Sequence, residues 1–313
     1  MQPSAKDKNI KQKCVGSILG LAIGDALGFP VEYKKSGDFI PVSDFRESNR
    51  AGLQKGDWSD DTAMSLCLAN SLIDKNGFDP VDQIQKYQKW LSEGYCSSTG
   101  KAVGVGQTVL RTLLTYRPGN EYVTISPRHS EGNGSLMRLA PVPLFFRNNP
   151  EKVIEYAGLS SKVTHGSPIC ADACRYYAGL ILGALNGVSK EDLLSPMYCT
   201  INNHWKHNNL ENEIKIIALG SFKKKQPREI RGGGYVVECL EAALWAFYTT
   251  DSFEDGVLRA VNLGDDADTT AAVYGQLAGA FYGIEKIPKH WVDGVTKSEM
   301  IQNVAEKLFL GKI

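Results

Sequence analysis

Four glycines recur at every fourth position near the N-terminus, and they constrain the fold more than any other feature of the chain. Gly16, Gly20, Gly24 and Gly28 lie within CVGSILGLAIGDALGFPVEY. In a helix, residues four apart share one face, and each glycine costs about 1 kcal/mol relative to alanine. We therefore expect a helix whose backbone is closely approached by another part of the chain.

The rest of the chain is dominated by apolar residues at helical spacing. Such segments cover 60–74, 79–92, 104–115, 134–147, 151–161, 168–186, 210–221, 235–249, 253–263 and 267–283. Alternating runs rich in Val, Ile and Thr, which are typical of strands, are nearly absent. Turn signals separate the segments, and no repeat of 20–50 residues is visible. The pattern predicts an all-α protein of roughly ten or more helices.

Composition excludes some classes of partner. The chain has 313 residues, and its 35 Lys plus Arg balance its 35 Asp plus Glu. A net charge of zero gives no general attraction to nucleic acid or to an anionic membrane. At about 150 residues per domain, the length alone allows one or two domains.

The N-terminus and the cysteines bear on location. Residues 1–12 are polar and are predicted to form a flexible extension, and the apolar stretch that follows carries Asp25, unlike a signal peptide or a membrane span. The seven cysteines include no C-x-x-C pair. We expect a reduced, cytoplasmic protein whose thiols lie in the core.

Two acidic motifs lie about two hundred residues apart: WSDDTAMSLCLANSL at 58–72 and GDDADTTAAVYGQLAGA at 264–280. Either motif alone is explained by helix capping, with Ser59 as the cap and Asp60 and Asp61 at the positive end of the helix. That arrangement contributes about 0.3–1 kcal/mol for each acid. Capping therefore remains an alternative for each motif taken alone.

The pair of motifs favours a cation site, because both precede very apolar helices that we expect inside the bundle. Carboxylates that converge there repel by about 4 kcal/mol per close pair at a protein-like dielectric, which helix dipoles cannot offset. The candidate ligands all offer oxygen and so favour Mg²⁺, Mn²⁺ or Ca²⁺ over zinc. They are Ser59, Asp60, Asp61, Asp266, Asp268 and Thr269. Asp265 is interpreted as a helix cap or as an acid outside the ligand set. If the two motifs share one site, the two ends of the chain meet, which favours a single domain, 1–313.

The motifs resemble those of the ADP-ribosylglycohydrolases related to dinitrogenase reductase-activating glycohydrolase. The resemblance covers nearly the whole chain. It rests on GSILGLAIGDALGFPVEY, WSDDTAMSL, GNGSLMRLAP, THGSPICADA, GGGYVVECLEAAL and NLGDDADTTAAVYGQLAGAFYG, which occur in the order of the family. It implies a compact orthogonal multi-helix bundle with two Mg²⁺ ions (or Mn²⁺) in a cleft. It also implies hydrolysis of the bond from C1″ of ADP-ribose to an acceptor side chain.

The resemblance assigns roles to individual residues. It places the metal ligands on the six oxygen-bearing residues above, with Ser59 where the family usually has Thr. The catalytic candidates are Glu32, Asp60, Asp61 and Asp268, with Glu32 or an aspartate as the general base for an attacking water. The substrate-binding candidates are Gly132, Asn133, Gly134, Ser135, Met137, His165 and Tyr235. The alternatives are an ordinary turn for the glycine-rich segment, a structural His165 and a core Tyr235.

One position departs from the family. Some arginine-specific members carry an Asp where this chain has Gly104. The predicted reaction removes ADP-ribose from arginine, and Gly104 keeps serine-linked ADP-ribose or another ADP-ribosyl conjugate open as a substrate. A member that only binds ADP-ribose is the alternative to an enzyme, although a binder has no need for the full set of ligands.

Other signals are weaker. Cys199, His204 and His207 lack the spacing of a zinc site, and the basic segment 223–231 is interpreted as a solvated loop. The expected partners are an ADP-ribosylated protein as substrate and ADP-ribose as product, with no nucleic acid and no membrane. We expect a monomer.

Overall fold

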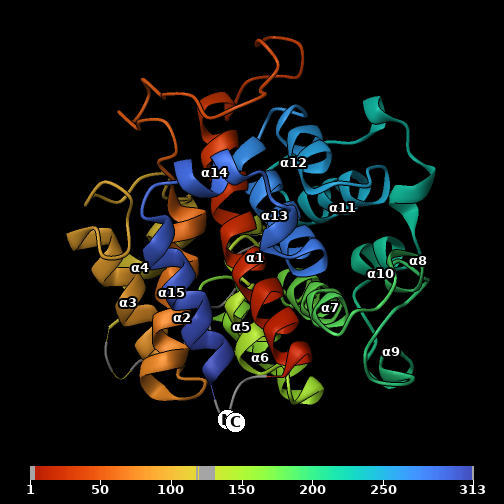
Figure 1. Cartoon of the computed structure of the whole chain (residues 1–313). Coiled ribbons are helices and arrows are strands. Elements are labelled where there is room, and N and C mark those ends of the chain that lie inside the picture. The colour runs from red at the N-terminus through yellow and green to blue at the C-terminus, as the bar shows by residue number, and fades with distance from the viewer. Residues whose placement is uncertain (1–3, 118, 120–130, 312–313) are drawn as a thin grey trace.

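The computed structural model describes residues 4–117, 119 and 131–311, and these residues form fifteen α-helices and five short 3-10 helices but no strand (Figure 1). The all-α prediction is confirmed. Nine predicted segments correspond to helices α2 (Asp60–Lys75), α3 (Pro80–Glu93), α4 (Gln107–Thr115), α6 (Pro150–Lys162), α7 (Pro168–Leu185), α10 (Asn212–Ala218), α11 (Val236–Tyr248), α12 (Phe253–Val261) and α13 (Ala267–Tyr282).

The remaining helices lie at the chain ends and between these segments. They are α1 (Ala5–Gly28), α5 (Pro141–Phe145), α8 (Lys190–Leu193), α9 (His204–His207), α14 (Lys289–Gly294) and α15 (Ser298–Leu310). The 3-10 helices are Phe29–Val31, Asn133–Ser135, Ser221–Lys224, Pro227–Glu229 and Ile284–Lys286.

The glycine stripe of α1 packs directly on the backbone of α13, and the two helices lie side by side at the centre of the molecule (Figure 1). A Cβ added to any of the four glycines would overlap that backbone. The contacts are Gly16 with Gly279, Gly20 with Gly275, Gly24 with Ala271 and Gly28 with Asp268. Since one numbering rises as the other falls, the helices are antiparallel. The stripe thus brings the C-terminal end of α1 against the first turn of α13.

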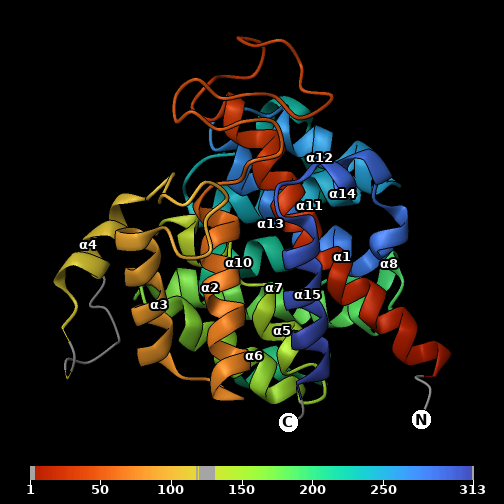
Figure 2. The same ribbon diagram turned by 60° about the vertical axis from the view of Figure 1, so that its left-hand side comes forward.

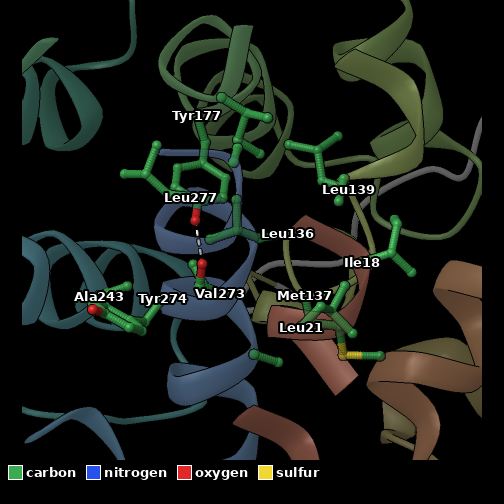
Figure 3. Packing of buried hydrophobic residues seen from close by; sticks show 14 of the residues in the cluster. Ile18, Leu21, Leu136, Met137, Leu139, Tyr177, Ala243, Val273, Tyr274 and Leu277 are labelled. Carbon is green, nitrogen blue, oxygen red and sulfur yellow. Dashed lines mark hydrogen bonds between the residues drawn. The ribbon is translucent and has the colours of Figure 1, made fainter. Parts of the chain in front are cut away.

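Helix α1 is a core helix. The span Ala5–Val31 is long and apolar enough to cross a membrane, yet 94% of its most apolar window is buried inside the protein. Around it, apolar side chains from several helices pack together, including Ile18, Leu21 and Leu277 (Figure 3). The Tyr177 hydroxyl donates a hydrogen bond to the carbonyl oxygen of Val273 within this cluster.

Two boundaries differ from the sequence predictions. Within the expected extension 1–12, helix α1 already begins at Ala5, because Ser4 and Asp7 form a capping box; residues 1–3 lie outside the described part. The predicted helix over 134–147 is replaced by a 3-10 turn and by α5, which starts only at Pro141. Proline suits the first turn of a helix, so Pro141 marks a start that apolar periodicity alone does not reveal.

One end of the bundle gathers three helix ends. The C-terminal end of α1 meets the N-terminal ends of α2 and α13, through Asp25 with Ser59 and Gly28 with Asp268. The segment that connects α1 to α2 arches over this end in both views (Figures 1 and 2). Both acidic motifs therefore lie here.

Candidate metal centre

A buried aspartate near the end of α1 organises the start of α2. Asp25 is fully buried and accepts hydrogen bonds from the backbone N–H groups of Ser59 (2.9 Å) and Thr62 (3.0 Å). It also accepts one from each of their hydroxyls, both at 2.7 Å. Four donors on one carboxylate fix the first turn of α2 relative to α1.

This arrangement differs from the capping alternative. Ser59 precedes α2, but its hydroxyl makes no capping hydrogen bond to that helix. The hydroxyl donates instead to Asp25 and lies 3.4 Å from Oδ2 of Asp61. Asp25 itself was not among the predicted site residues. The signal was present, because Asp25 is the only charged residue between Lys13 and Glu32.

The start of α13 is held in a different way. Asp266 precedes the helix without a capping hydrogen bond, and its Oδ2 accepts from Nδ2 of Asn133 at 2.7 Å. Gly28 packs against the backbone of Asp268, which is 2% exposed. Asp265 is exposed, and its backbone pairs with Tyr33 and Lys34, so it lies apart from the buried acids.

The acids at this end, of which Glu32 and Asp266 are half-buried and the others buried, form two groups that share one residue. Carboxylate oxygens of Asp25, Asp61 and Asp268 all lie within 4.8 Å of one another, and so do those of Glu32, Asp266 and Asp268. Four of the predicted residues thus converge, together with the unpredicted Asp25. Asp60 is buried beside them but belongs to neither group. Ser59 and Thr269 are also buried at this end, at 2% and 5% exposure.

Burial raises the pKa of every one of these acids, and the charges of neighbouring acids raise it further for Glu32, Asp60, Asp61 and Asp268. Burial is the largest cause for the six, which are Asp25, Glu32, Asp60, Asp61, Asp266 and Asp268. For Asp61, the neighbouring charges of Asp25 and Asp60 raise the pKa further. Hydrogen bonds to Asp25 oppose the effect without cancelling it. Charged carboxylates at this density are stable only with compensating positive charge.

Two carboxylate oxygens indicate where a compensating cation binds. Oδ1 of Asp61 and Oδ1 of Asp268 are buried and have no hydrogen-bond partner. Buried polar atoms are nearly always satisfied, so an unsatisfied pair of carboxylate oxygens in an acidic group fits a bound cation. The donors are oxygen only, which suits hard divalent ions. These buried aspartate groups can hold metal ions.

Glu32 forms an ion pair with Arg50, which lies in the segment between α1 and α2. Its Oε2 forms an ion pair with Nη2 of Arg50, and its side chain is 6% exposed. The Arg50 guanidinium lies over the rings of Phe29 and Tyr33, with 4.5 Å and 4.7 Å to the ring centroids. Arg50, which the sequence did not single out, thereby holds Glu32 in place, and a carboxylate oxygen of Glu32 lies within 4.8 Å of those of Asp266 and Asp268.

The predicted glycine-rich segment lies next to the second acidic group. The backbone N–H of Asn133 donates to the carbonyl of Gly234, and Gly132 forms a bridge with Tyr235. Ser135 is buried, and its hydroxyl hydrogen bonds with that of Ser161 at 2.8 Å. Since the Asn133 side chain also binds Asp266, the segment is fixed relative to the acids.

The buried His165 ring packs against the glycine-rich segment at Gly132 and Gly134. It is 2% exposed, and a Cβ added to Gly134 would lie 2.9 Å from its Cε1 atom. Its Nδ1 hydrogen bonds with the Thr164 hydroxyl at 2.9 Å. Burial, followed by the charge of Arg138, lowers the pKa of His165 to about 3, so the ring is neutral near pH 7.

Two further predicted residues, Met137 and Tyr235, and the departing position Gly104 have clear places in the structure. Met137 is 3% exposed and belongs to the same hydrophobic cluster as Leu21, so its side chain is part of the core (Figure 3). Tyr235 is 38% exposed just before α11. Gly104 has a φ of +85°, and a Cβ there would overlap Oδ1 of Asp60. The substrate-binding roles of Met137 and Tyr235 stay predictions.

Other features lie apart from the acids. A cavity of about 800 Å³ is lined by residues that include Lys35, Arg228, Arg259 and the exposed Asp265, but by none of the predicted ligands. Among the residues that the structure describes, Cys199, His204 and His207 belong to no group with metal-ligand spacing.

Comparison with known proteins agrees with this geometry. The family profile described as ADP-ribosylglycohydrolase matches residues 6–312. The ADP-ribosylarginine hydrolase Tri1 of Serratia proteamaculans is 37% identical over 95% of this chain and 79% of its own length. The ADP-ribosyl-[dinitrogen reductase] glycohydrolase of Rhodospirillum rubrum is 29% identical, over 91% of this chain and 90% of that protein.

A solved structure is also similar. The structure titled ADP-ribosylglycohydrolase-related protein complex matches with a TM-score of 0.84 and 36% identity. The match covers 98% of this chain and 100% of the other. The likeness therefore extends over the whole fold.

Proposed function

The chain belongs to the ADP-ribosylglycohydrolase family, and from this premise we propose that it removes ADP-ribose from arginine side chains of proteins. The reaction is hydrolysis of the bond between C1″ of the distal ribose and the arginine guanidinium, which reverses mono-ADP-ribosylation. The name of the Serratia relative supports the arginine linkage. The substrate is then an ADP-ribosylated protein, and ADP-ribose is one product.

The observation that carries the proposal is the shared position of Asp268 in both acidic groups. We propose that the two groups hold two Mg²⁺ ions, or Mn²⁺, with Asp25, Asp61 and Asp268 on one side and Glu32, Asp266 and Asp268 on the other. The Ser59 and Thr269 hydroxyls lie among these acids and are proposed as further ligands. When bound, the cations supply positive charge that orients the ribose hydroxyls and polarises a water.

The side chains of the chain itself account for the remaining steps. Glu32 is bound by Arg50 and has a carboxylate oxygen within 4.8 Å of those of Asp266 and Asp268, and we propose that it accepts a proton from the attacking water. Burial raises the pKa of Glu32, which strengthens it as a base. The water oxygen bonds to C1″ as the bond from C1″ to nitrogen breaks, through an oxocarbenium-like state; the nitrogen leaves with the bonding electrons and takes up the proton that the water has released. Asn133 and the glycine-rich segment are proposed to bind the diphosphate.

Gly104 supports a second candidate, serine-linked ADP-ribose. The Asp of some arginine-specific members is absent here, and this backbone leaves no space beside Asp60 for a side chain. The two candidates share the acids and differ only in the atom that leaves C1″.

The test is release of free ADP-ribose from arginine-linked, serine-linked and nucleic-acid-linked substrates, with and without Mg²⁺. The proposal predicts Mg²⁺-dependent release from the arginine-linked protein. Release from the serine-linked substrate alone would show that the protein is a hydrolase of serine-linked and not of arginine-linked ADP-ribose. Binding of ADP-ribose without release from any substrate would indicate a binding protein.

The organisation of the chain supports a single domain, 1–313, because α1 and α13 come from opposite ends and pack along their length. The cytoplasmic location and the monomeric state stay predictions.

A further inference from the structure

We propose that Arg138 and Thr164 are positioning residues, which hold the His165 ring so that its Nε2 atom donates a hydrogen bond to the diphosphate of ADP-ribose. The sequence points to His165 but not to the residues that hold its ring. This role rests on the proposed function, because the ligand is ADP-ribose bound at the glycine-rich segment.

Arg138 is a fully buried cation whose described hydrogen-bond acceptors are all neutral. Its guanidinium donates to the carbonyl oxygens of Gly134 at 3.1 Å and Ser160 at 3.4 Å, and to the Thr164 hydroxyl at 2.7 Å. Burial of a cation without a paired anion costs free energy, which an ordinary packing contact does not require. One side chain thus contacts both the glycine-rich segment and the residue that precedes His165.

The Thr164 hydroxyl transmits this orientation to the His165 ring. Arg138 can only donate, so the hydroxyl oxygen accepts from it and the single hydroxyl hydrogen is left for another acceptor. Thr164 is 1% exposed, and the acceptor that the described residues offer is Nδ1 of His165 at 2.9 Å. Buried donors are nearly always satisfied, so Nδ1 accepts this hydrogen bond. In a neutral imidazole the other nitrogen, Nε2, then carries the hydrogen.

The Nε2 atom of His165 lies against the glycine-rich segment. A Cβ added to Gly132 would lie 3.5 Å from Nε2, and a Cβ added to Gly134 would lie 3.2 Å from it. His165 is 2% exposed, and the described part of the chain provides no acceptor for a hydrogen bond from Nε2. Glycine lets a ligand approach the backbone closely, and phosphate oxygens are strong acceptors. The Nε2–H group is therefore the donor that remains for the diphosphate.

The opposite tautomer would give this position the opposite polarity. With its hydrogen on Nδ1, His165 would donate to the Thr164 hydroxyl, whose own hydrogen would then lack an acceptor among the described residues. Nε2 would present a lone pair, which repels phosphate oxygens. The hydroxyl of Thr164 thus decides whether His165 attracts or repels the ligand.

The first experiment determines the tautomer in the unaltered full chain with nitrogen-15-labelled histidine. A long-range proton–nitrogen correlation spectrum near pH 7 distinguishes protonated from unprotonated ring nitrogens, and the His165→Phe variant identifies the His165 signals. We expect hydrogen on Nε2 of His165. The Thr164→Val variant should show a mixture of tautomers, and Thr164→Ser, which keeps the hydroxyl, should restore the Nε2 form. Hydrogen on Nδ1 in the unaltered chain would overturn the proposal.

The second experiment measures ADP-ribose binding by calorimetry in the presence of Mg²⁺. Thr164→Val should bind at least about tenfold more weakly than the unaltered chain, and Thr164→Ser should stay within about threefold. With ADP-ribosylarginine protein as substrate, Thr164→Val should raise KM and change kcat by less than about threefold. Equal binding by Thr164→Val and the unaltered chain would contradict the positioning role alone. Absence of ADP-ribose binding by the unaltered chain would refute the proposed function, and this role with it.

A double variant separates positioning from general loosening of the fold. His165→Phe should weaken ADP-ribose binding about as much as Thr164→Val, and the combination of both should weaken it no further. Losses that multiply in the double variant would show that Thr164 acts by a route other than His165, and would overturn the proposal.

Discussion

The two helix starts that build the acidic centre are held by different forces. The start of α2 is fixed by hydrogen bonds, since Ser59 and Thr62 direct four donors at Asp25. The start of α13 is fixed by close packing, since Gly28 leaves no gap against the backbone of Asp268. One side thus depends on polar atoms and the other on the absence of a side chain. The two sides should fail in different ways when altered.

The largest effect is expected where the two sides meet. Asp268→Asn removes a charge that both groups share, and we expect a loss of at least about a thousandfold in Mg²⁺-dependent turnover with the fold intact. The control is Asp265→Asn, three residues earlier and exposed, which should stay within about twofold. Steady-state ADP-ribose release measures both. Full activity of the Asp268→Asn variant would show that the Asp268 charge is not required for the reaction.

Breaking the packed side should cost stability as well as activity. In Gly28→Ala, the new Cβ overlaps the backbone of Asp268, and we expect the free energy of unfolding to fall by about 1–3 kcal/mol. Gly77→Ala is the matched control, because its Cβ would meet only the Lys75 carbonyl at 3.8 Å. Urea unfolding followed by circular dichroism compares them. Equal stability of the two variants would mean that α1 and α13 can separate at no cost.

Without cations, the charged acids should destabilise the folded state as pH rises. Burial raises the pKa of Asp268 in the folded protein, so this state binds more protons than the unfolded state. The stabilising proton is present below the unfolded value near pH 4 and is lost as pH rises through the folded pKa. Relative to Asp268→Asn, the metal-free protein should lose about 1.4 kcal/mol per unit of pKa elevation.

Chelated protein and protein with excess Mg²⁺, melted across a pH series, provide this measurement. Mg²⁺ should restore the melting temperature of the unaltered chain and leave that of Asp268→Asn nearly unchanged. A melting temperature that rises with pH relative to the variant in chelator would reverse the predicted sign.

The smallest effect is expected on the hydrogen-bonded side. Ser59→Ala removes one of the hydroxyls on Asp25 but keeps the backbone donor, so we expect a loss of about 1 kcal/mol in unfolding free energy. Ser59→Thr, which keeps the hydroxyl, is the control. Thermal melts of both variants decide whether the hydroxyl or the backbone group dominates this contact.

The sequence predicted the parts of this centre that have a local signature. Helical periodicity located α2 and α13, and the acids before each apolar helix marked Asp61, Asp266 and Asp268. The glycine stripe predicted a close approach, although the partner helix became evident only in the structure.

The missed parts depend on contacts between distant residues. Asp25 reaches Ser59 across 34 positions, and Asn133 reaches Asp266 across 133, so no spacing rule links them. Arg50 lies in a segment without helical periodicity, and its role depends on stacking between Phe29 and Tyr33. Such interactions follow from the fold rather than from neighbouring residues.

The central claim is that the two acidic motifs form one centre with two cations around Asp268. A crystal soaked in Mn²⁺ and measured at the manganese absorption edge tests this claim most directly. We expect two anomalous peaks that flank the Asp268 carboxylate, one beside Asp25 and Asp61 and the other beside Glu32 and Asp266. Absence of any peak at Asp268, or peaks only at exposed carboxylates, would contradict the account.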